Sequence, residues 1–201
     1  MGVKSFWRRL KSWCRQDVAS YLYQCSTISL CSTAPPLLPG LQPCCYDRAN
    51  LAREQRLLHN LPPVIEQRVA QGNLAILAVK GQEWIFRSAA VLGPRTYSVT
   101  GYPLALQADE AYLECAETVP AWRGKGIAPG MLRPTAETLL ARGVTRVYLL
   151  IGVQNTASCR AAEKGGASRL GLITSRRRFG QWTSSFQEHA ARETIPFTAR
   201  A

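Results

Sequence analysis

The stretch "AYLECAETVPAWRGKGIAPG", residues 111–130, joins a strand-like segment to the start of a helix through a glycine-rich turn. Residues 111–119 are typical of a β-strand, and apolar residues at helical spacing follow from Ile127 to a stop at Gly143. Between them lie three glycines and two cations in residues 120–130. Glycines allow a tight turn and keep side chains away, so several N–H groups can point at one anion. This stretch therefore predicts an anion-binding turn.

Two common glycine motifs do not fit this turn. A dinucleotide-binding fingerprint needs a glycine where Pro129 stands, and a nucleoside-triphosphate loop needs Ser or Thr after its lysine, where Gly126 stands. The pattern that remains is R-x-x-G-x-A, from Arg123 to Ala128, directly before a helix. The positive end of a helix dipole suits a pyrophosphate.

The flanking sequence predicts an α/β domain. Residues 47–72 are typical of helical turns interrupted at Pro62-Pro63, and residues 73–93 predict two strands around Gly81. A further strand is expected through 104–106, and the nearly continuous apolar run 144–153 predicts a strand buried on both faces. A short helix from Asn155 and another strand from 167 follow. We expect a mixed sheet with helices on both sides.

Residues 1–45 are predicted to be a basic N-terminal extension and Pro-rich linker, and residues 46–201 the folded domain. In the extension Phe6, Leu10 and Trp13 share a helical face among cations. Two interpretations remain open. One is an interfacial helix that contacts an anionic membrane or a nucleic acid, and the other is an amphipathic helix docked on its own domain.

The composition indicates a basic protein of one domain. In 201 residues, 25 Lys and Arg against 13 Asp and Glu give a net charge of +12, which attracts polyanions. The seven cysteines include no C-x-x-C pair and accompany only two histidines, so we predict free thiols in a reducing cytoplasm and no metal. No run is apolar enough for a spanning helix, so we expect a cytoplasmic protein with at most peripheral membrane contact.

The order of these elements resembles the GNAT superfamily of acyl-CoA-dependent N-acyltransferases. The resemblance rests on the strand "AYLECAETV", the turn "PAWRGKGIA", the strand "VYLLIGV" and the segment "QNTASCRAAEKGGA". It is close over residues 110–170 and looser from residue 46. It implies a mixed, mostly antiparallel central sheet that is splayed between its two central strands, with acetyl-CoA as co-substrate and no metal.

The resemblance also implies which residues bind the coenzyme. Its pyrophosphate would lie on the backbone of the turn, and its pantetheine arm would pair with the main chain of Val119. Asn155 and Ser158 would contact it from the far side of the cleft. The residues implied for the turn are Arg123, Gly124, Lys125, Gly126, Ile127 and Ala128.

Catalysis needs a proton acceptor for the attacking amine and a donor for the developing oxyanion. Glu114 lies where some members of the superfamily carry a general base, and Glu117 and Glu110 are alternatives. Strand alternation puts Glu110 and Glu114 on one face and Glu117 on the other. The main-chain N–H of Val119 is the predicted oxyanion donor.

The chain departs from the superfamily pattern at three positions. Ala162 stands where many members place a tyrosine as general acid, Ala167 replaces an aromatic residue, and Pro134 predicts a kink in the helix after the turn. Two functions follow as hypotheses. The first is an N-acetyltransferase acting on an amine of an unidentified acceptor. The second is a degenerate member that binds coenzyme A, anionic lipid or RNA without catalysis.

Overall fold

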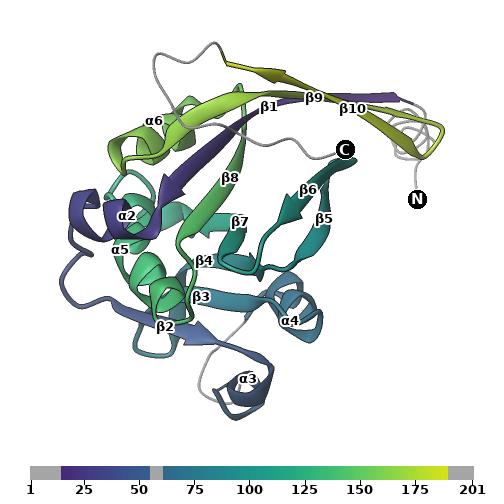
Figure 1. Ribbon diagram of the computed structural model, residues 1–201. Coiled ribbons are helices and arrows are strands. Elements are labelled where there is room, and N and C mark those ends of the chain that lie inside the picture. Colours follow the sequence, from purple (N-terminus) through teal and green to yellow (C-terminus); the bar gives the residue numbers. More distant parts are fainter. Residues whose placement is uncertain (1–14, 55–60, 190–201) are drawn as a thin grey trace, which may run out of the picture.

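A computed structural model describes residues 15–54 and 61–189 as one α/β fold (Figure 1). The strands are β1 (Arg15–Ser26), β2 (Gln42–Tyr46), β3 (Leu74–Lys80), β4 (Glu83–Leu92), β5 (Arg95–Val99), β6 (Tyr102–Leu106), β7 (Glu110–Thr118), β8 (Arg146–Gly152), β9 (Ser168–Arg178) and β10 (Gln181–Glu188). The helices are α2 (Thr27–Thr33), α3 (Arg48–Glu54), α4 (Pro63–Ala70), α5 (Ile127–Leu140) and α6 (Thr156–Lys164), with a 3-10 turn, η1, at Pro120–Trp122. The predicted amphipathic segment around Phe6, Leu10 and Trp13 lies outside the described residues.

The central sheet has the order β10-β9-β1-β8-β7-β4-β3-β2, and β5 and β6 form a separate hairpin. Every neighbouring pair is antiparallel except β7 and β8, which run parallel. Their pairing runs only from Glu110–Arg146 to Leu113–Leu149, although β7 continues to Thr118 and β8 to Gly152. The two central strands therefore part beyond Leu113, which confirms the predicted fold class with its splay.

Alternating side chains bury both faces of the sheet. On one face, β3 and β7 contribute Leu74, Ile76, Ala111 and Leu113 to a core that also contains residues of α2, α5 and α6. On the other face, α3 and α4 pack on β2 and β3, and the β5–β6 hairpin packs over β7, β8, β1 and β9. Figure 1 shows these two layers on opposite sides of the sheet, so helices cover both faces as predicted.

The N-terminal part of the chain corrects the predicted domain boundary. Residues 15–45, assigned by sequence to an extension and linker, form β1, α2 and all but the last residue of β2, and β1 lies inside the sheet between β8 and β9. In the stretch 18–26 the side chains alternate, so that Leu22 faces one core and Tyr23 the other. The serines and glutamine that interrupt the apolar run fit this period of two, which a search for continuous hydrophobicity does not detect.

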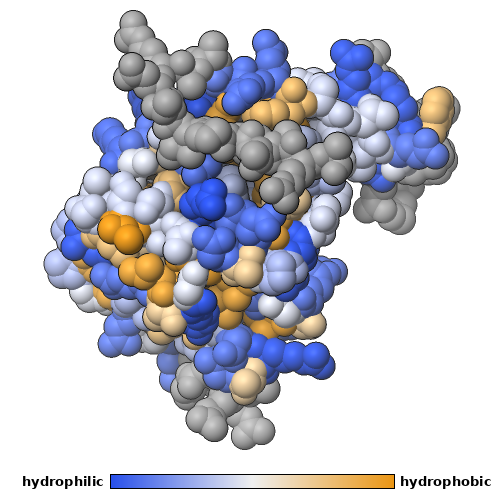
Figure 2. Space-filling view, in the orientation of Figure 1, coloured by the Kyte–Doolittle hydropathy of each residue, from blue (hydrophilic) through white to orange (hydrophobic). Residues whose placement is uncertain are grey.

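One end of β1, β9 and β10 extends beyond the rest of the sheet as a three-stranded arm (Figure 1). Hydrophilic side chains cover most of this arm (Figure 2). Arg178 donates from Nη2 to Asp17 at 3.0 Å, and the guanidinium of Arg177 lies 5.9 Å from the ring centroid of Trp182. Arg177 and Arg178 are therefore partly engaged by side chains of the arm's own strands.

Candidate active site

The predicted anion-binding turn lies between η1 and the first turn of α5. Gly124 and Gly126 have φ angles of 76° and 75°, and a Cβ at either position would meet nothing within 4 Å. These glycines are therefore needed for their left-handed backbone, and the space in front of them is open. Gly130, one helical turn later, is needed because the main chain packs closely there. A Cβ at this position would lie 3.1 Å from the main chain of Pro36 and Leu37.

The N–H groups of this turn are not used in backbone pairing outside regular elements. Within the described residues, none of those from Gly124 to Ala128 donates to such a backbone carbonyl. Ile127, which is 2% exposed, anchors the start of α5 in the core. The residues from Arg123 to Gly126 are exposed and lead directly into a helix N-terminus, a geometry suited to a phosphate-type anion.

The two cations of the turn behave differently. Arg123 donates from Nε to the carbonyl of Thr118 at 3.0 Å, and its Nη2 lies 3.8 Å from Oε1 of Glu117. Its charge is therefore directed back toward β7 and partly compensated. Lys125 extends instead over the ring of Trp122, with its Nζ 4.7 Å from the ring centroid.

Val119 does not fit the oxyanion role predicted from sequence. Its N–H donates to the carbonyl of Ile85 at 2.9 Å, and its carbonyl accepts from the N–H of Trp122 at 2.8 Å. The N–H is therefore engaged within the sheet, because β4 extends far enough to pair with the end of β7, and this bond does not support the oxyanion role. The carbonyl has a second lone pair, so its contact with a pantetheine arm stays a prediction.

A β-bulge interrupts β7 at Cys115 and Ala116. Arg87 pairs with Glu117 and Ala89 with Glu114, so Cys115 and Ala116 together lie opposite Ser88. Cys115 has a φ angle of 57°, which is uncommon for a residue with a side chain. The bulge interrupts the ladder at the point where β7 and β8 have parted, and bulges often re-aim groups beside active sites. No local signal in the sequence predicts it.

The carboxylate of Glu114 is largely buried, at 9% exposure, on the face covered by α4 and the hairpin. Its Oε1 lies 2.8 Å from Nε of Arg68 on α4, and the Tyr97 hydroxyl on β5 donates to its two oxygens at 3.0 and 2.9 Å. Burial, followed by the hydrogen bond to Glu114, raises the pKa of Tyr97 to about 12. Sequence reasoning singled out Glu114 but missed both of its partners.

The alternative carboxylates have other partners. Glu117 pairs with Arg87, whose Nε donates to Oε2 at 3.0 Å, and with Arg123. Glu110 is 4% exposed and accepts from the Tyr148 hydroxyl at 3.0 Å and from the N–H of Gln107 at 2.9 Å. Glu110 lies at the closed end of the β7–β8 pair, so it is a structural residue. Glu110 and Glu114 share a face as predicted.

The predicted contacts from the far side of the cleft lie at the start of α6. Asn155 is the N-cap of this helix, and its Oδ1 accepts from the N–H of Ser158 at 3.2 Å. The structure thus brings these two predicted residues together and gives Asn155 a capping role. Ala162 is buried at 4% exposure, and β1 supplies a phenol nearby: the Tyr23 hydroxyl donates to Glu163 on α6 at 3.0 Å. Tyr23 is 0% exposed, and burial raises its pKa.

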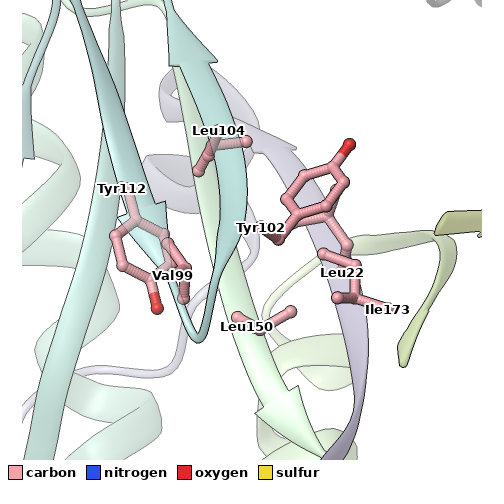
Figure 3. Close-up of a pocket in the computed structure, with 7 residues that line it drawn as sticks. All are labelled: Leu22, Val99, Tyr102, Leu104, Tyr112, Leu150 and Ile173. Carbon is pink, nitrogen blue, oxygen red and sulfur yellow. The ribbon is translucent and has the colours of Figure 1, made fainter. Parts of the chain in front are cut away.

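An apolar group of side chains closes the hairpin side of the splay (Figure 3). Side chains of the hairpin and of four sheet strands point toward one another and leave no room for a water-sized molecule. Their residues are Val99, Tyr102 and Leu104 of the hairpin with Leu22, Tyr112, Leu150 and Ile173 of the sheet. The tip of the hairpin is held by β10, because the hydroxyl of Ser184 donates to the carbonyl of Gly101 at 3.0 Å. The Tyr97 ring lies 5.8 Å from that of Tyr112, so the polar cluster of Glu114 borders this apolar group.

Within residues 15–54 and 61–189, no group of three or more His, Cys, Asp or Glu side chains is arranged to hold a metal ion. In the same residues, no helix is long and apolar enough to span a bilayer.

The comparisons with known proteins agree with this geometry. The model of the acetyltransferase (GNAT) family matches residues 78–167, from the end of β3 to the residue before β9. Among curated proteins, no sequence match was found. Members of this family are in general acyltransferases that take acetyl-CoA as co-substrate.

Solved structures share the fold at low sequence identity. A GCN5-related N-acetyltransferase-like protein from Streptococcus suis superposes with a TM-score of 0.55 at 14% identity, over 90% of this chain and 67% of its own. A GCN5-related N-acetyltransferase from Sphaerobacter thermophilus gives a TM-score of 0.53 at 15% identity, over 88% of this chain and 56% of its own. A GNAT-family acetyltransferase from Colwellia psychrerythraea gives 0.53 at 14% identity, over 87% and 57%. The match thus spans between 56% and 67% of the length of these relatives. Residues 78–167 are therefore similar in sequence to the acetyltransferase (GNAT) family, and the chain shares the fold of solved GNAT-family structures.

Proposed function

We propose that this protein is an N-acetyltransferase that transfers an acetyl group from acetyl-CoA to an amine. The observation that carries the proposal is the turn from Gly124 to Ala128 at the start of α5, whose N–H groups donate to no backbone carbonyl outside regular elements within the described residues. Two glycines in the left-handed region shape this turn, and a Cβ at either would meet nothing within 4 Å. Such a turn supports binding of a pyrophosphate.

The reaction forms a C–N bond and breaks the C–S bond of the thioester. The acceptor amine must lose a proton as it attacks, and the thiolate that leaves must gain one. Glu114 is our candidate for the proton acceptor, directly or through one water, because it lies on β7 where that strand leaves β8. Arg68 and Tyr97 are positioning residues that hold its carboxylate. Glu117, bound by two arginines, remains the alternative.

The main chain of the bulge at Cys115 and Ala116 is our candidate for the oxyanion donor in place of Val119. Cys115 and Ala116 fall outside the β4–β7 register, whereas the N–H of Val119 donates to the carbonyl of Ile85. A preorganised N–H at the reacting carbonyl lowers the barrier because charge develops there only in the transition state. Since Ala162 offers no proton, we infer that solvent protonates the leaving thiolate.

Calorimetric titration with acetyl-CoA tests the proposal, using the wild type and a Gly126→Glu variant. The new carboxylate would project into open space at the turn and repel the pyrophosphate. We expect saturable binding to the wild type and a loss of at least about 100-fold in the variant, equivalent to about 2.7 kcal/mol. Binding that is unchanged in Gly126→Glu would exclude the turn as the coenzyme site.

An acyl-transfer assay then separates the enzyme from the second candidate, a module that binds the coenzyme without catalysis. The observation that favours this alternative is Ala162, which stands where many members of the superfamily carry a tyrosine. Release of free thiol from acetyl-CoA, measured with a panel of primary amines, should exceed release without amine if the protein is a transferase. Tight coenzyme binding with no amine-dependent release across the panel would favour the module.

A further inference from the structure

Two lysines from distant parts of the sequence converge on one tryptophan beside the glycine turn. The Nζ of Lys80 lies 5.0 Å from the ring centroid of Trp122, and the Nζ of Lys125 lies 4.7 Å from it. Lys80 ends β3, Trp122 lies in η1, and Lys125 belongs to the turn itself. We call these three residues the cationic shelf. The pairing of β3 with β4, and of β4 with β7, brings Lys80 to this place.

The shelf concentrates positive charge that the described residues do not compensate. No carboxylate in residues 15–54 or 61–189 lies within ion-pair distance of either ammonium group. Both lysines are exposed, whereas Trp122 is half-buried. The ring attracts each ammonium and restricts side chains that would otherwise lose rotamer freedom on binding a ligand. The arrangement is therefore a preorganised pair of like charges, which a bound anion would stabilise.

The nearby arginine does not share this role. Arg123 is turned toward Thr118 and Glu117, as described above, so its charge is partly compensated. The shelf thus supplies the cations that remain available next to the N–H groups of the turn. Consider a ligand whose pyrophosphate lies on the turn. An anionic group that is separated from this pyrophosphate by one sugar would lie near the shelf.

We propose that the cationic shelf recognises the 3′-phosphate on the ribose of coenzyme A. This inference rests on the proposed function, because it assumes that the coenzyme occupies the turn. The 3′-phosphate is a monoester separated from the pyrophosphate by the ribose, and a phosphate monoester carries a charge of about −1.5 to −2 at pH 7. Two ammonium groups match that charge, and lysine binds phosphate as a point charge without a fixed fork geometry. The shelf thereby selects coenzyme A over carriers that end in a pyrophosphate or a pantetheine.

The test is a thermodynamic cycle that removes the 3′-phosphate from the ligand, the Lys80 ammonium from the protein, or both. Acetyl-CoA and acetyl-3′-dephospho-CoA are titrated calorimetrically into the wild type and into Lys80→Gln. A hydrogen bond to a charged group contributes about 1.5–3 kcal/mol, so the wild type should prefer acetyl-CoA by about tenfold or more. In Lys80→Gln we expect this preference to fall below about threefold, with the affinity for the dephospho ligand nearly unchanged.

Lys164→Gln is the matched control, because it removes the same charge from an exposed lysine at the C-terminal end of α6. It should retain the preference of the wild type. Trp122→Leu removes the ring while keeping both lysines, and it should reduce the preference part of the way. Thermal unfolding of each variant verifies that it is folded.

The possible failures are distinguishable. Equal affinity of the wild type for the two ligands would overturn the shelf and leave the proposed function standing. The role of the shelf would also be overturned if Lys80→Gln kept the full preference for acetyl-CoA. The same holds if the variant lost affinity for both ligands equally. Absence of binding for either ligand would overturn the shelf together with the coenzyme site.

Discussion

The glycine turn follows the end of β7, and the Glu114 cluster lies on β7 just beyond the point where it parts from β8. The two are built in opposite ways. The turn uses six consecutive residues, Arg123–Ala128, and its shape depends on two local φ angles. Within the described residues, its N–H groups from Gly124 onward donate to no backbone carbonyl outside regular elements. The cluster uses Arg68, Tyr97 and Glu114, from α4, β5 and β7, and its carboxylate is almost buried. A short continuous segment can therefore carry a binding site, whereas positioning a carboxylate in this fold requires three elements.

This contrast predicts that the cluster controls the rate while the turn controls affinity. In Glu114→Gln we expect kcat to fall by about 10²–10⁴, because a positioned proton acceptor contributes that much, and the Kd for acetyl-CoA to stay within about twofold. Glu117→Gln is the matched control on the same strand, and it should retain most of the rate. Equal rate losses in the two variants would remove the distinction that we draw between these carboxylates.

The cluster should also behave as one energetic unit. Arg68→Met leaves the carboxylate of Glu114, which is 9% exposed, without its cation, so the free energy of unfolding should fall by about 2 kcal/mol. The double variant Arg68→Met with Glu114→Gln should lose less than the sum of the single losses, since no buried charge is then left unpaired. Urea unfolding measures all four proteins. Strict additivity would show that the two side chains are not coupled.

The turn should respond to backbone shape alone. Alanine at Gly124 or Gly126 places a Cβ at a φ near 75°, which costs about 1–2 kcal/mol without any steric clash. We expect either variant to be less stable and to bind acetyl-CoA about tenfold more weakly, because its N–H groups change direction. Gly152→Ala is the control: that glycine also has open space but no positive φ. A similar loss in Gly152→Ala would argue against backbone shape as the cause.

The smallest effect concerns the Tyr97 phenol at alkaline pH. Its pKa is raised to about 12 in the folded protein, mainly by burial and next by its bond to Glu114, against an unfolded value of 10.0. The stabilisation is therefore fully present below pH 10 and is lost as the pH rises from 10 to 12. In Tyr97→Phe the free energy of unfolding should be about 1 kcal/mol lower than in the wild type at pH 8. It should also decline less steeply between pH 10 and 12. Urea unfolding at several pH values measures this, and an unchanged decline would contradict the assignment.

Local sequence patterns predicted the elements around the turn well. The strands on either side of Gly81, the helix from Ile127 to Leu140 and the stop near Gly143 are confirmed. The helix continues through Pro134 as a single element. These predictions succeeded because periodicity and glycine placement depend on neighbours within a few residues.

The site was predicted less completely, for two physical reasons. Arg68 and Tyr97 come to Glu114 from 46 and 17 residues away, and no spacing rule relates positions on separate elements. The availability of the Val119 N–H depends on whether Ile85 of β4 reaches it, and local sequence does not reveal this. The bulge at Cys115 likewise exists only through the register of β7 against β4.

The sequence by itself determined the strand, turn and helix that hold an open row of N–H groups, because dihedral preferences and the helix start are local properties. It also singled out Glu114, on β7, as the candidate carboxylate. Only the tertiary structure decided that β1 belongs inside the sheet, that Arg68 and Tyr97 hold Glu114, and that Lys80 joins Lys125 over Trp122. Each of these depends on which strands pair and in what register, and pairing is selected by the burial of whole faces, which no single segment specifies.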